Sequence, residues 1–175
     1  MPDFRGPQGV WTVNPAAEQQ STLQQARCRD AWAWDAHAVP ERTERLHLTL
    51  HFLGAVPQRR LPELIDGLRV SFSAFTLHLD RAQCWSNGIA VLTPQAVPQA
   101  VPQALLALHA ALRVGLERLD QATETRRWRP HLTLARHASG SAAPAKAAPV
   151  HWPVRGVGAG LNLSSFSRSE RACSC

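Results

Sequence analysis

Two short segments of the chain carry the same four residues, and their residue types suit acid–base chemistry. His-Leu-Thr-Leu occupies positions 47–50 and again positions 131–134, 84 residues further along. Alternate side chains of a β-strand point to one face, so the His and Thr of each segment lie on the same face, about 6.6 Å apart along the strand. Each segment therefore presents one nitrogen that can exchange a proton and one hydroxyl that can bond an oxyanion.

A pair of such segments suits phosphodiester hydrolysis without a metal. If the two segments pack around a two-fold axis, His47 and His131 face each other. One imidazole can then remove a proton from water while the other protonates the leaving oxygen. The alternative for each histidine is a plain position on the solvent face of a strand. Repetition in matching contexts, followed by basic residues, favours the catalytic pair.

The wider contexts, LHLTLHFLG at 46–54 and RPHLTLAR at 129–136, resemble the two-histidine phosphoesterase superfamily. Within it, they are similar to the bacterial RNA 2′,3′-cyclic phosphodiesterases, also called 2′-5′ RNA ligases. The resemblance covers about residues 10–157. It implies an α+β fold of two antiparallel sheets with outer helices, related by a pseudo-two-fold axis, with the motifs lining a cleft. We expect one bilobal domain over residues 1–175.

The resemblance also implies roles for the motif residues. His47 would protonate the leaving 3′-oxygen and His131 would activate water, although the pair is better defined than this division of labour. Thr49 and Thr133 would bind the phosphoryl oxygens. No metal and no cofactor is expected. The implied substrate is RNA or a nucleotide ending in a 2′,3′-cyclic phosphate.

Further substrate contacts are predicted around the motifs. Arg136 would hold a phosphate through charged hydrogen bonds, although its position in the alternation is opposite to that of His131. Arg129, with Arg127, is a weaker candidate for the RNA backbone. Trp11 would stack on a base, with core packing as the alternative. His51 shares the predicted open face of His47, about 13 Å along the strand, and would bind substrate at the periphery.

Three other histidines, His78, His109 and His151, have no partner motif, and we interpret them as structural. Cys28, Cys84, Cys173 and Cys175 match no zinc or redox spacing, and we expect free thiols, with metal binding by Cys173 and Cys175 as the alternative.

The net charge of +6 is concentrated in one part of the chain. Eleven arginines balance eleven acidic residues up to position 120, whereas residues 121–175 hold eight basic residues against two acidic ones. Such a surplus attracts phosphates or a polyanion.

The composition and the hydrophobic pattern bound the class of protein. A hydrophobic content of 45% indicates a globular chain, and no apolar run is long enough to span a membrane. Without a secretory signal at the start, we expect a cytoplasmic monomer. Periodicity predicts helices over residues 16–38, 57–72 and 102–120. It predicts strands over residues 9–13, 46–52 (ended by Gly54), 75–81, 88–94, 131–136 and 150–157, with no clear strand after residue 158.

Three functional hypotheses follow. The first is a metal-independent phosphodiesterase that opens a 2′,3′-cyclic phosphate to a 2′-phosphate, with 2′-5′ ligation as related chemistry in the reverse direction. The second is an RNA- or nucleotide-binding module that has lost catalysis. The third, ranked lowest, is a metal site built from His47, His51 and a third ligand.

Overall fold

The computed structural model describes residues 8–13, 19–97, 100–125, 127–155 and 158–162, with the backbone alone described for 8–13, 19–22 and 158–162. Its strands are β1 (Gln8–Val13), β2 (Val39–Pro40), β3 (Leu48–Ala55), β4 (Phe75–Leu79), β5 (Arg81–Cys84), β6 (Ala90–Thr93), β7 (Leu132–Arg136), β8 (Val150–Val154) and β9 (Gly158–Asn162). Its helices are α1 (Gln19–Asp30), α2 (Leu61–Gly67) and α3 (Gln103–Arg118), with 3₁₀ turns η2 (Thr43–Arg45) and η3 (Gln58–Arg60).

The principal sheet has a symmetric strand order. Its strands run β5-β6-β7-β3-β1-β9, all neighbours are antiparallel, and the short β2 pairs with β7. The two motif strands, β7 and β3, lie at the centre of this order, each followed outward by two more strands. Strands β4 and β8 form a separate pair. The predicted α+β fold of antiparallel strands is confirmed, whereas the two halves, expected as two sheets, are joined into one sheet by the pairing of β3 with β7.

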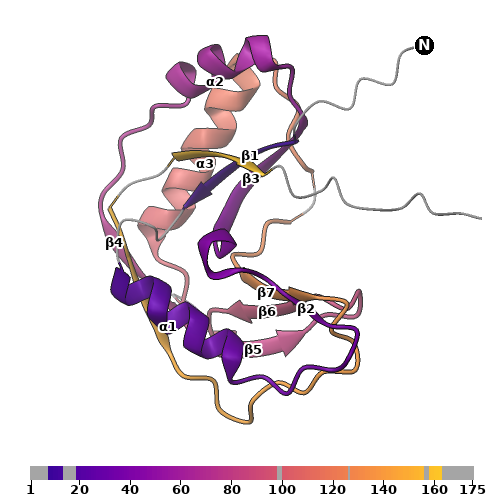
Figure 1. Ribbon diagram of the computed structural model, residues 1–175. Coiled ribbons are helices and arrows are strands. Elements are labelled where there is room, and N and C mark those ends of the chain that lie inside the picture. The colour runs from indigo at the N-terminus through magenta and orange to yellow at the C-terminus, as the bar shows by residue number, and fades with distance from the viewer. Residues whose placement is uncertain (1–7, 14–18, 98–99, 126, 156–157, 163–175) are drawn as a thin grey trace, which may run out of the picture.

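The two halves meet at one residue pair. Between β3 and β7 the register is Leu48 opposite Leu132, and both side chains are fully buried. These leucines occupy the same place in the two motifs, between His and Thr. The pseudo-two-fold axis therefore passes beside this pair. Figure 1 shows α2 and α3 beside β1 and β3, and α1 in the half that holds β5 to β7.

Both motif strands contain a β-bulge at the same motif position. In the pairing of β3 with β1, the register skips Leu50, and in the pairing of β7 with β6 it skips Leu134. An extra residue reverses the alternation of side chains beyond it. The burial pattern of the first five residues is accordingly the same in both strands, with the fifth residue, Phe52 or Arg136, exposed. Strict alternation over residues 46–52 would place Phe52 with the buried leucines, and the bulge places it on the exposed face instead.

The long helix was predicted well, and the other two were predicted too long. In α3, leucines at helical spacing are buried, namely Leu105, Leu108, Leu112 and Leu116. Only residues 61–67 of the expected helix 57–72 are α-helical, after the η3 turn. Ile65, within this helix, is 43% exposed. Helix α1 ends at Asp30, after which Trp32 and Trp34 stack with ring centroids 5.0 Å apart.

The strands differ from the predictions at three places. Strand β3 continues past Gly54, which takes a φ of +65° beside a second register shift and so bends the strand instead of ending it. Strand β5 was not predicted. Strand β9 lies where no strand was expected, because backbone pairing with β1 needs no side-chain alternation.

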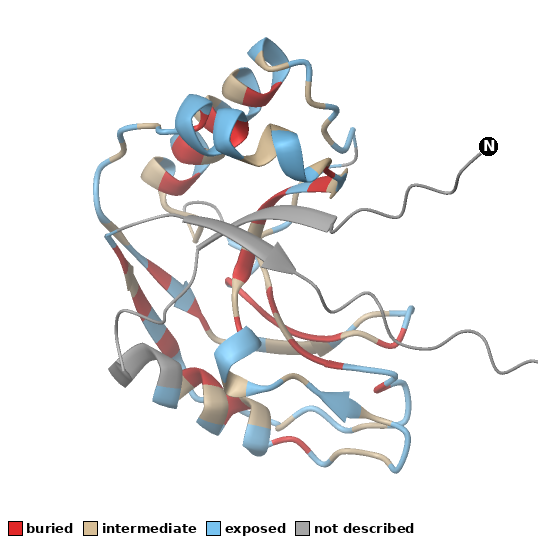
Figure 2. Cartoon of the chain, turned by 45° about the horizontal axis from the view of Figure 1, so that its top comes forward, coloured by how far each residue is buried: buried red, intermediate tan, exposed pale blue. Residues whose placement is uncertain are grey.

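The two cysteines in the described part of the chain, Cys28 and Cys84, are free thiols, as predicted; Cys173 and Cys175 lie outside it. Buried residues occur in both halves of the molecule (Figure 2). Among the described residues, no helix is long and apolar enough to cross a membrane.

The central leucine pair should dominate stability. Leu132→Ala removes a fully buried side chain at the join and should lower the free energy of unfolding by about 2–5 kcal/mol. The matched control, Ile65→Ala, removes an exposed aliphatic side chain and should cost less than about 1 kcal/mol. Chemical denaturation followed by tryptophan fluorescence measures both. Equal losses would show that the join is not a critical part of the core.

Candidate active site

The register at the join brings the four motif side chains together. Because Leu48 lies opposite Leu132 in an antiparallel pair, continuing the register places Thr49 next to His131 and His47 next to Thr133. The two leucines point into the core, so the four polar side chains lie on the other face, where all are partly exposed. Sequence spacing predicted each His–Thr pair, and the tertiary pairing brings the two pairs together.

Both motif histidines are held by the same backbone hydrogen bond. Nδ1 of His47 lies 2.5 Å from the carbonyl oxygen of Arg45, and Nδ1 of His131 lies 2.7 Å from that of Arg129. A carbonyl oxygen can only accept, so Nδ1 carries the hydrogen in each ring. In the neutral ring the lone pair is then on Nε2. Each ring is therefore oriented so that Nε2 gains or loses a proton.

A stack of three rings lies behind the first motif. Trp128 stacks on His109 with centroids 4.2 Å apart, and His109 stacks on His51 at 4.1 Å. The indole N–H of Trp128 donates to the carbonyl oxygen of Thr49 at 3.0 Å, and Nε2 of His51 lies 2.9 Å from the carbonyl oxygen of His109. The bonded carbonyl of Thr49 precedes the bulge. The stack thus fixes the backbone of the motif where its strand is irregular.

Burial keeps the stacked imidazoles neutral. It lowers the pKa of His109 to about 4, and the nearby charges of His51 and Arg113 add to this effect, while a hydrogen bond with the Leu50 backbone opposes it. The pKa of His51 is also lowered, mainly by burial. Uncharged rings pack face to face without repulsion. This pair of histidines is therefore structural at neutral pH.

The predicted open-face position of His51 is wrong. The bulge at Leu50 turns the His51 side chain inward, where it is only 6% exposed and stacks on His109. Its place on the motif face is taken by Phe52, which is 36% exposed. Sequence alternation missed Phe52 because a one-residue bulge leaves no trace in the hydrophobic pattern.

The same kind of bulge moves Arg136 to the face of the second motif. Its side chain is 56% exposed, and Nε lies 3.3 Å from Oε1 of Glu41, whose own side chain is 21% exposed. The backbone N–H of Glu41 donates to the carbonyl of Leu134 at 2.8 Å, which fixes the carboxylate beside β7. Glu41 could not be identified from the sequence, because it lies 95 residues from Arg136 along the chain.

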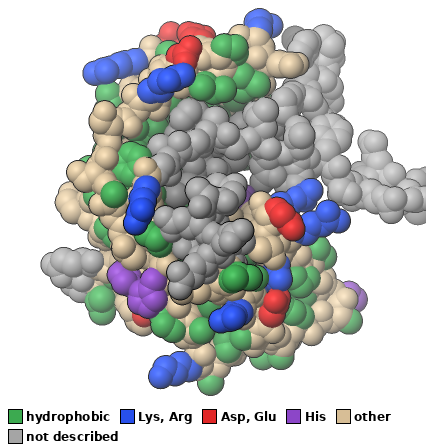
Figure 3. Space-filling model, turned by 60° about the vertical axis from the view of Figure 1, so that its left-hand side comes forward, with side chains coloured by type: hydrophobic (Ala, Val, Ile, Leu, Met, Phe, Trp, Pro, Cys, Tyr) green, Lys and Arg blue, Asp and Glu red, His purple; other side chains and the backbone are tan. Residues whose placement is uncertain are grey.

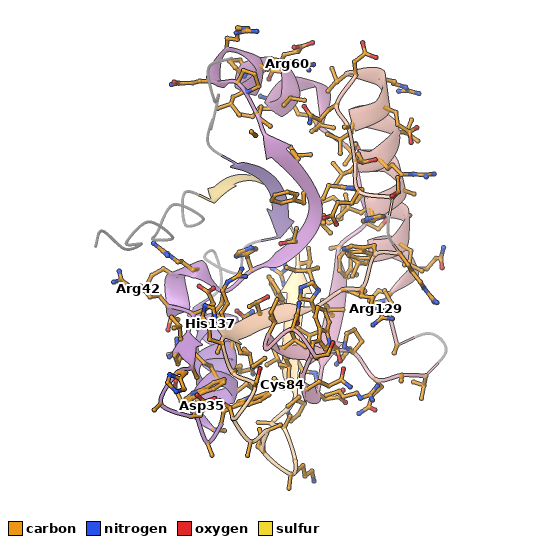
Figure 4. All side chains as sticks on the ribbon, turned by 90° about the vertical axis from the view of Figure 1, so that its right-hand side faces the viewer. Asp35, Arg42, Arg60, Cys84, Arg129 and His137 are labelled. Carbon is orange, nitrogen blue, oxygen red and sulfur yellow. The ribbon has the colours of Figure 1, made fainter. Side chains whose placement is uncertain are left out.

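The remaining predicted residues are placed as follows. Arg129, labelled in Figure 4, is exposed. Its carbonyl oxygen accepts the hydrogen bond from His131. The backbone of Trp11 pairs opposite His51 in β1, and its side chain lies outside the description. Trp85, which sequence analysis did not single out, lies with its ring centroid 4.7 Å from that of His131. It follows β5 directly, in a hairpin whose tertiary position alone brings it to the motif.

Among the described residues, no group of three or more His, Cys, Asp or Glu side chains is arranged to hold a metal ion. The hypothesis of a metal site on His47 and His51 therefore has no third ligand in the described part of the chain. The Nε2 atom of His51 is also engaged with the His109 carbonyl.

Comparison with known proteins agrees with this arrangement. A family model described as LigT-like phosphoesterase matches residues 13–91, which include the first motif. A crystal structure described as a phosphoesterase is 26% identical, with a TM-score of 0.70 over 85% of this chain and 84% of that one. LigT of E. coli in complex with 3′-AMP is also 26% identical, with a TM-score of 0.69 over 85% and 83% of the two chains. The chain is similar to the LigT-like phosphoesterases in sequence over residues 13–91 and in fold over 85% of its length.

More distant structures share the fold. A Thermus thermophilus protein is 23% identical, with a TM-score of 0.65 over 87% of this chain and 86% of that one. No curated protein sequence matches the chain. The second motif lies beyond the region matched by the family model, so its equivalence to the first rests on the matching bulges, burial and hydrogen bonds described above.

Acid should weaken the fold of this protein through the ring stack. The unfolded chain takes up a proton at His109 near pH 6.5, whereas the folded chain does so only near pH 4. The free energy of unfolding should therefore fall as the pH is lowered through this window, by on the order of 1–2 kcal/mol after allowance for solvent screening.

The test compares the parent with His109→Phe, which keeps an aromatic ring in the stack but cannot titrate. Urea denaturation between pH 7 and pH 4 should show a smaller loss in the variant. His37→Phe, at an exposed loop position, serves as the control and should behave like the parent. Identical pH profiles for the parent and His109→Phe would show that the stack does not couple to protonation.

Proposed function

We propose that this protein hydrolyses 2′,3′-cyclic phosphates on RNA ends or nucleotides to 2′-phosphates, without a metal. The observation that carries the proposal is the equivalent pair of histidines at the join. Each has Nδ1 bonded to the carbonyl two residues earlier, and each has a motif threonine as its neighbour across the Leu48–Leu132 pair. Two equivalent imidazoles on one face supply the base and the acid that an in-line displacement requires.

The two histidines and one water molecule account for every proton and bond that changes in the proposed hydrolysis. Nε2 of neutral His131 takes a proton from water as the water oxygen bonds to phosphorus. The bond from phosphorus to the 3′-oxygen breaks, and protonated His47 donates its Nε2 proton to that oxygen. Thr49 and Thr133 donate hydrogen bonds to the non-bridging oxygens, where negative charge builds up. The assignment of acid and base follows the family resemblance, since the two hydrogen-bond arrangements are alike.

The surroundings of the two motifs differ, so the substrate would bind in one orientation. At the fifth motif-strand position, the second half presents the cation Arg136 and the first half presents the aromatic Phe52. Arg136 would bind a phosphate after leaving Glu41, with Arg129 as a second cation. Phe52 would stack against a base, as proposed for Trp11, because aromatic faces bind unpaired bases.

The relatives support a nucleotide substrate. E. coli LigT has been crystallised with 3′-AMP, NADP+, ATP and phosphate. Ligation of RNA ends through a 2′-5′ bond would use the same groups in the reverse direction. The binding-module hypothesis is less favoured, because both motifs have the catalytic side chains and the backbone hydrogen bonds that place the ring hydrogen on Nδ1. We further propose a cytoplasmic monomer that forms one domain, on the sequence alone.

Removing either motif histidine should abolish most of the hydrolysis. His47→Ala and His131→Ala should each lower the single-turnover rate on a nucleoside 2′,3′-cyclic phosphate by about 10² to 10⁴-fold. The double variant should lose far less than the product of the two losses, because the residues act as a unit. Thr49→Ala and Thr133→Ala should cost less. His37→Ala is the control, and chromatography identifies the product as the 2′-phosphate.

The parent should keep its activity in a metal chelator and show a bell-shaped pH profile, which one neutral and one protonated imidazole produce. An absolute requirement for a divalent ion would contradict the mechanism. Full activity of either single histidine variant would do so as well. Binding of the substrate without turnover in the parent would instead support the binding module.

The ion pair of Arg136 offers a second test, with variants of opposite effect. Arg136→Ala should weaken substrate binding and reduce the slope of log affinity against log salt by about 1. Glu41→Gln removes the competing carboxylate and should tighten binding by up to about fivefold, the value of an exposed ion pair. Fluorescence anisotropy with a labelled oligonucleotide measures both. If neither affinity changes, Arg136 does not contact the phosphate.

A further inference from the structure

We propose that His78 and His151 form a surface binding site for a divalent transition-metal ion, with copper(II) preferred. They are direct cross-strand partners in the β4–β8 pair, and both side chains are exposed. Their Nδ1 atoms lie 2.7 Å apart, with the ring planes at 84°. Neither residue belongs to the motifs at the join, so the site is independent of the proposed hydrolysis. The proposal gives both histidines a role beyond the structural one expected from the sequence.

The strand pair holds the two rings in place before any ion binds. On either side of the histidine pair, Leu77 opposes Trp152 and Leu79 opposes Val150, and all four side chains are at most 1% exposed. These buried pairs fix the register, so the histidines must project from the opposite, open face. Little conformational entropy is then lost when both nitrogens bind one ion.

Helix α1 adds a further restraint. The backbone N–H of His151 donates to Oε1 of Gln24 at 3.2 Å, which ties β8 to the helix. Figure 3 shows histidine side chains gathered on the face of the molecule where β4 runs in Figure 1. The pair is therefore open to solvent on a rigid part of the fold.

The distance between the nitrogens favours one coordination geometry. Two nitrogens about 2.0 Å from an ion stand about 2.8 Å apart at a right angle and about 3.3 Å apart at a tetrahedral angle. The observed 2.7 Å is close to the first value, which is the tetragonal arrangement of copper(II) or nickel(II). Copper(II) also forms the strongest complexes of the divalent series.

Binding of copper(II) to the two Nδ1 atoms requires no net loss of protons from the rings. Without an ion, one Nδ1 must donate a hydrogen to the other, because two lone pairs would repel each other at this distance. Copper(II) replaces this shared hydrogen and binds both lone pairs. The ring that donated this hydrogen keeps it by moving it to Nε2, and the other neutral ring already carries its hydrogen there. Water fills the remaining positions, since no third His, Cys, Asp or Glu among the described residues joins the pair. Binding should weaken in acid, as protons compete for Nδ1.

The experiment uses copper(II)–iminodiacetate, in which the chelator leaves adjacent coordination positions for two imidazoles. The full-length protein carries Cys173→Ser and Cys175→Ser, so that no terminal thiol can bind or reduce the ion. We expect this protein to bind the complex and to melt at a higher temperature in its presence. Electron paramagnetic resonance should show nitrogen ligation at this site.

His78→Gln and His151→Gln, in the same background, should each abolish that shift and that signal. His37→Gln, at an exposed loop position outside the pair, should retain both. Circular dichroism and cyclic-phosphate hydrolysis at the level of the parent would show that the variants are folded. Unchanged binding in either His78→Gln or His151→Gln would overturn the proposal. So would the absence of binding to the parent, even if the variants lost thermal stability.

Discussion

The contact between Leu48 and Leu132 determines the geometry of the whole site. These two side chains are fully buried and form the single registered pair between β3 and β7. A slip of one residue would turn one motif toward the core and bury its histidine and threonine without partners, at a cost of several kcal/mol. Hydrophobic burial of the leucines therefore aligns the polar residues that flank them.

Two further features refine that alignment. The matching bulges at Leu50 and Leu134 reverse the alternation after each motif, so that Phe52 and Arg136 lie on the face of the proposed chemistry. Backbone carbonyls then fix the hydrogen of each motif histidine on Nδ1. Neither feature requires an unusual residue. Both arise from backbone geometry, and that geometry is repeated in the two halves.

The symmetry is broken by the residues that support each motif. His51 in the first half corresponds to Ala135 in the second, and both are buried. In the first half, the space is filled by the stack of His51, His109 and Trp128, whose indole bonds the motif backbone. In the second half, Trp85 instead contacts the ring of His131. Different support gives two equivalent imidazoles different environments, which is what separate acid and base roles require.

The sequence by itself determined the repeated motif, the faces shared by His and Thr and the place of helix α3. These properties depend on local periodicity, which can be recognised from neighbouring residues. The antiparallel fold was expected from the family resemblance of the two motifs and not from periodicity. The sequence did not predict the bulges, the inward turn of His51, the ion pair of Arg136 with Glu41 or the strand β9. Each depends on which backbone lies alongside, between segments far apart in the chain. Only the tertiary structure decides that pairing. A β-bulge is defined by two residues of one strand lying opposite one residue of the partner strand, so it cannot be recognised from one strand alone.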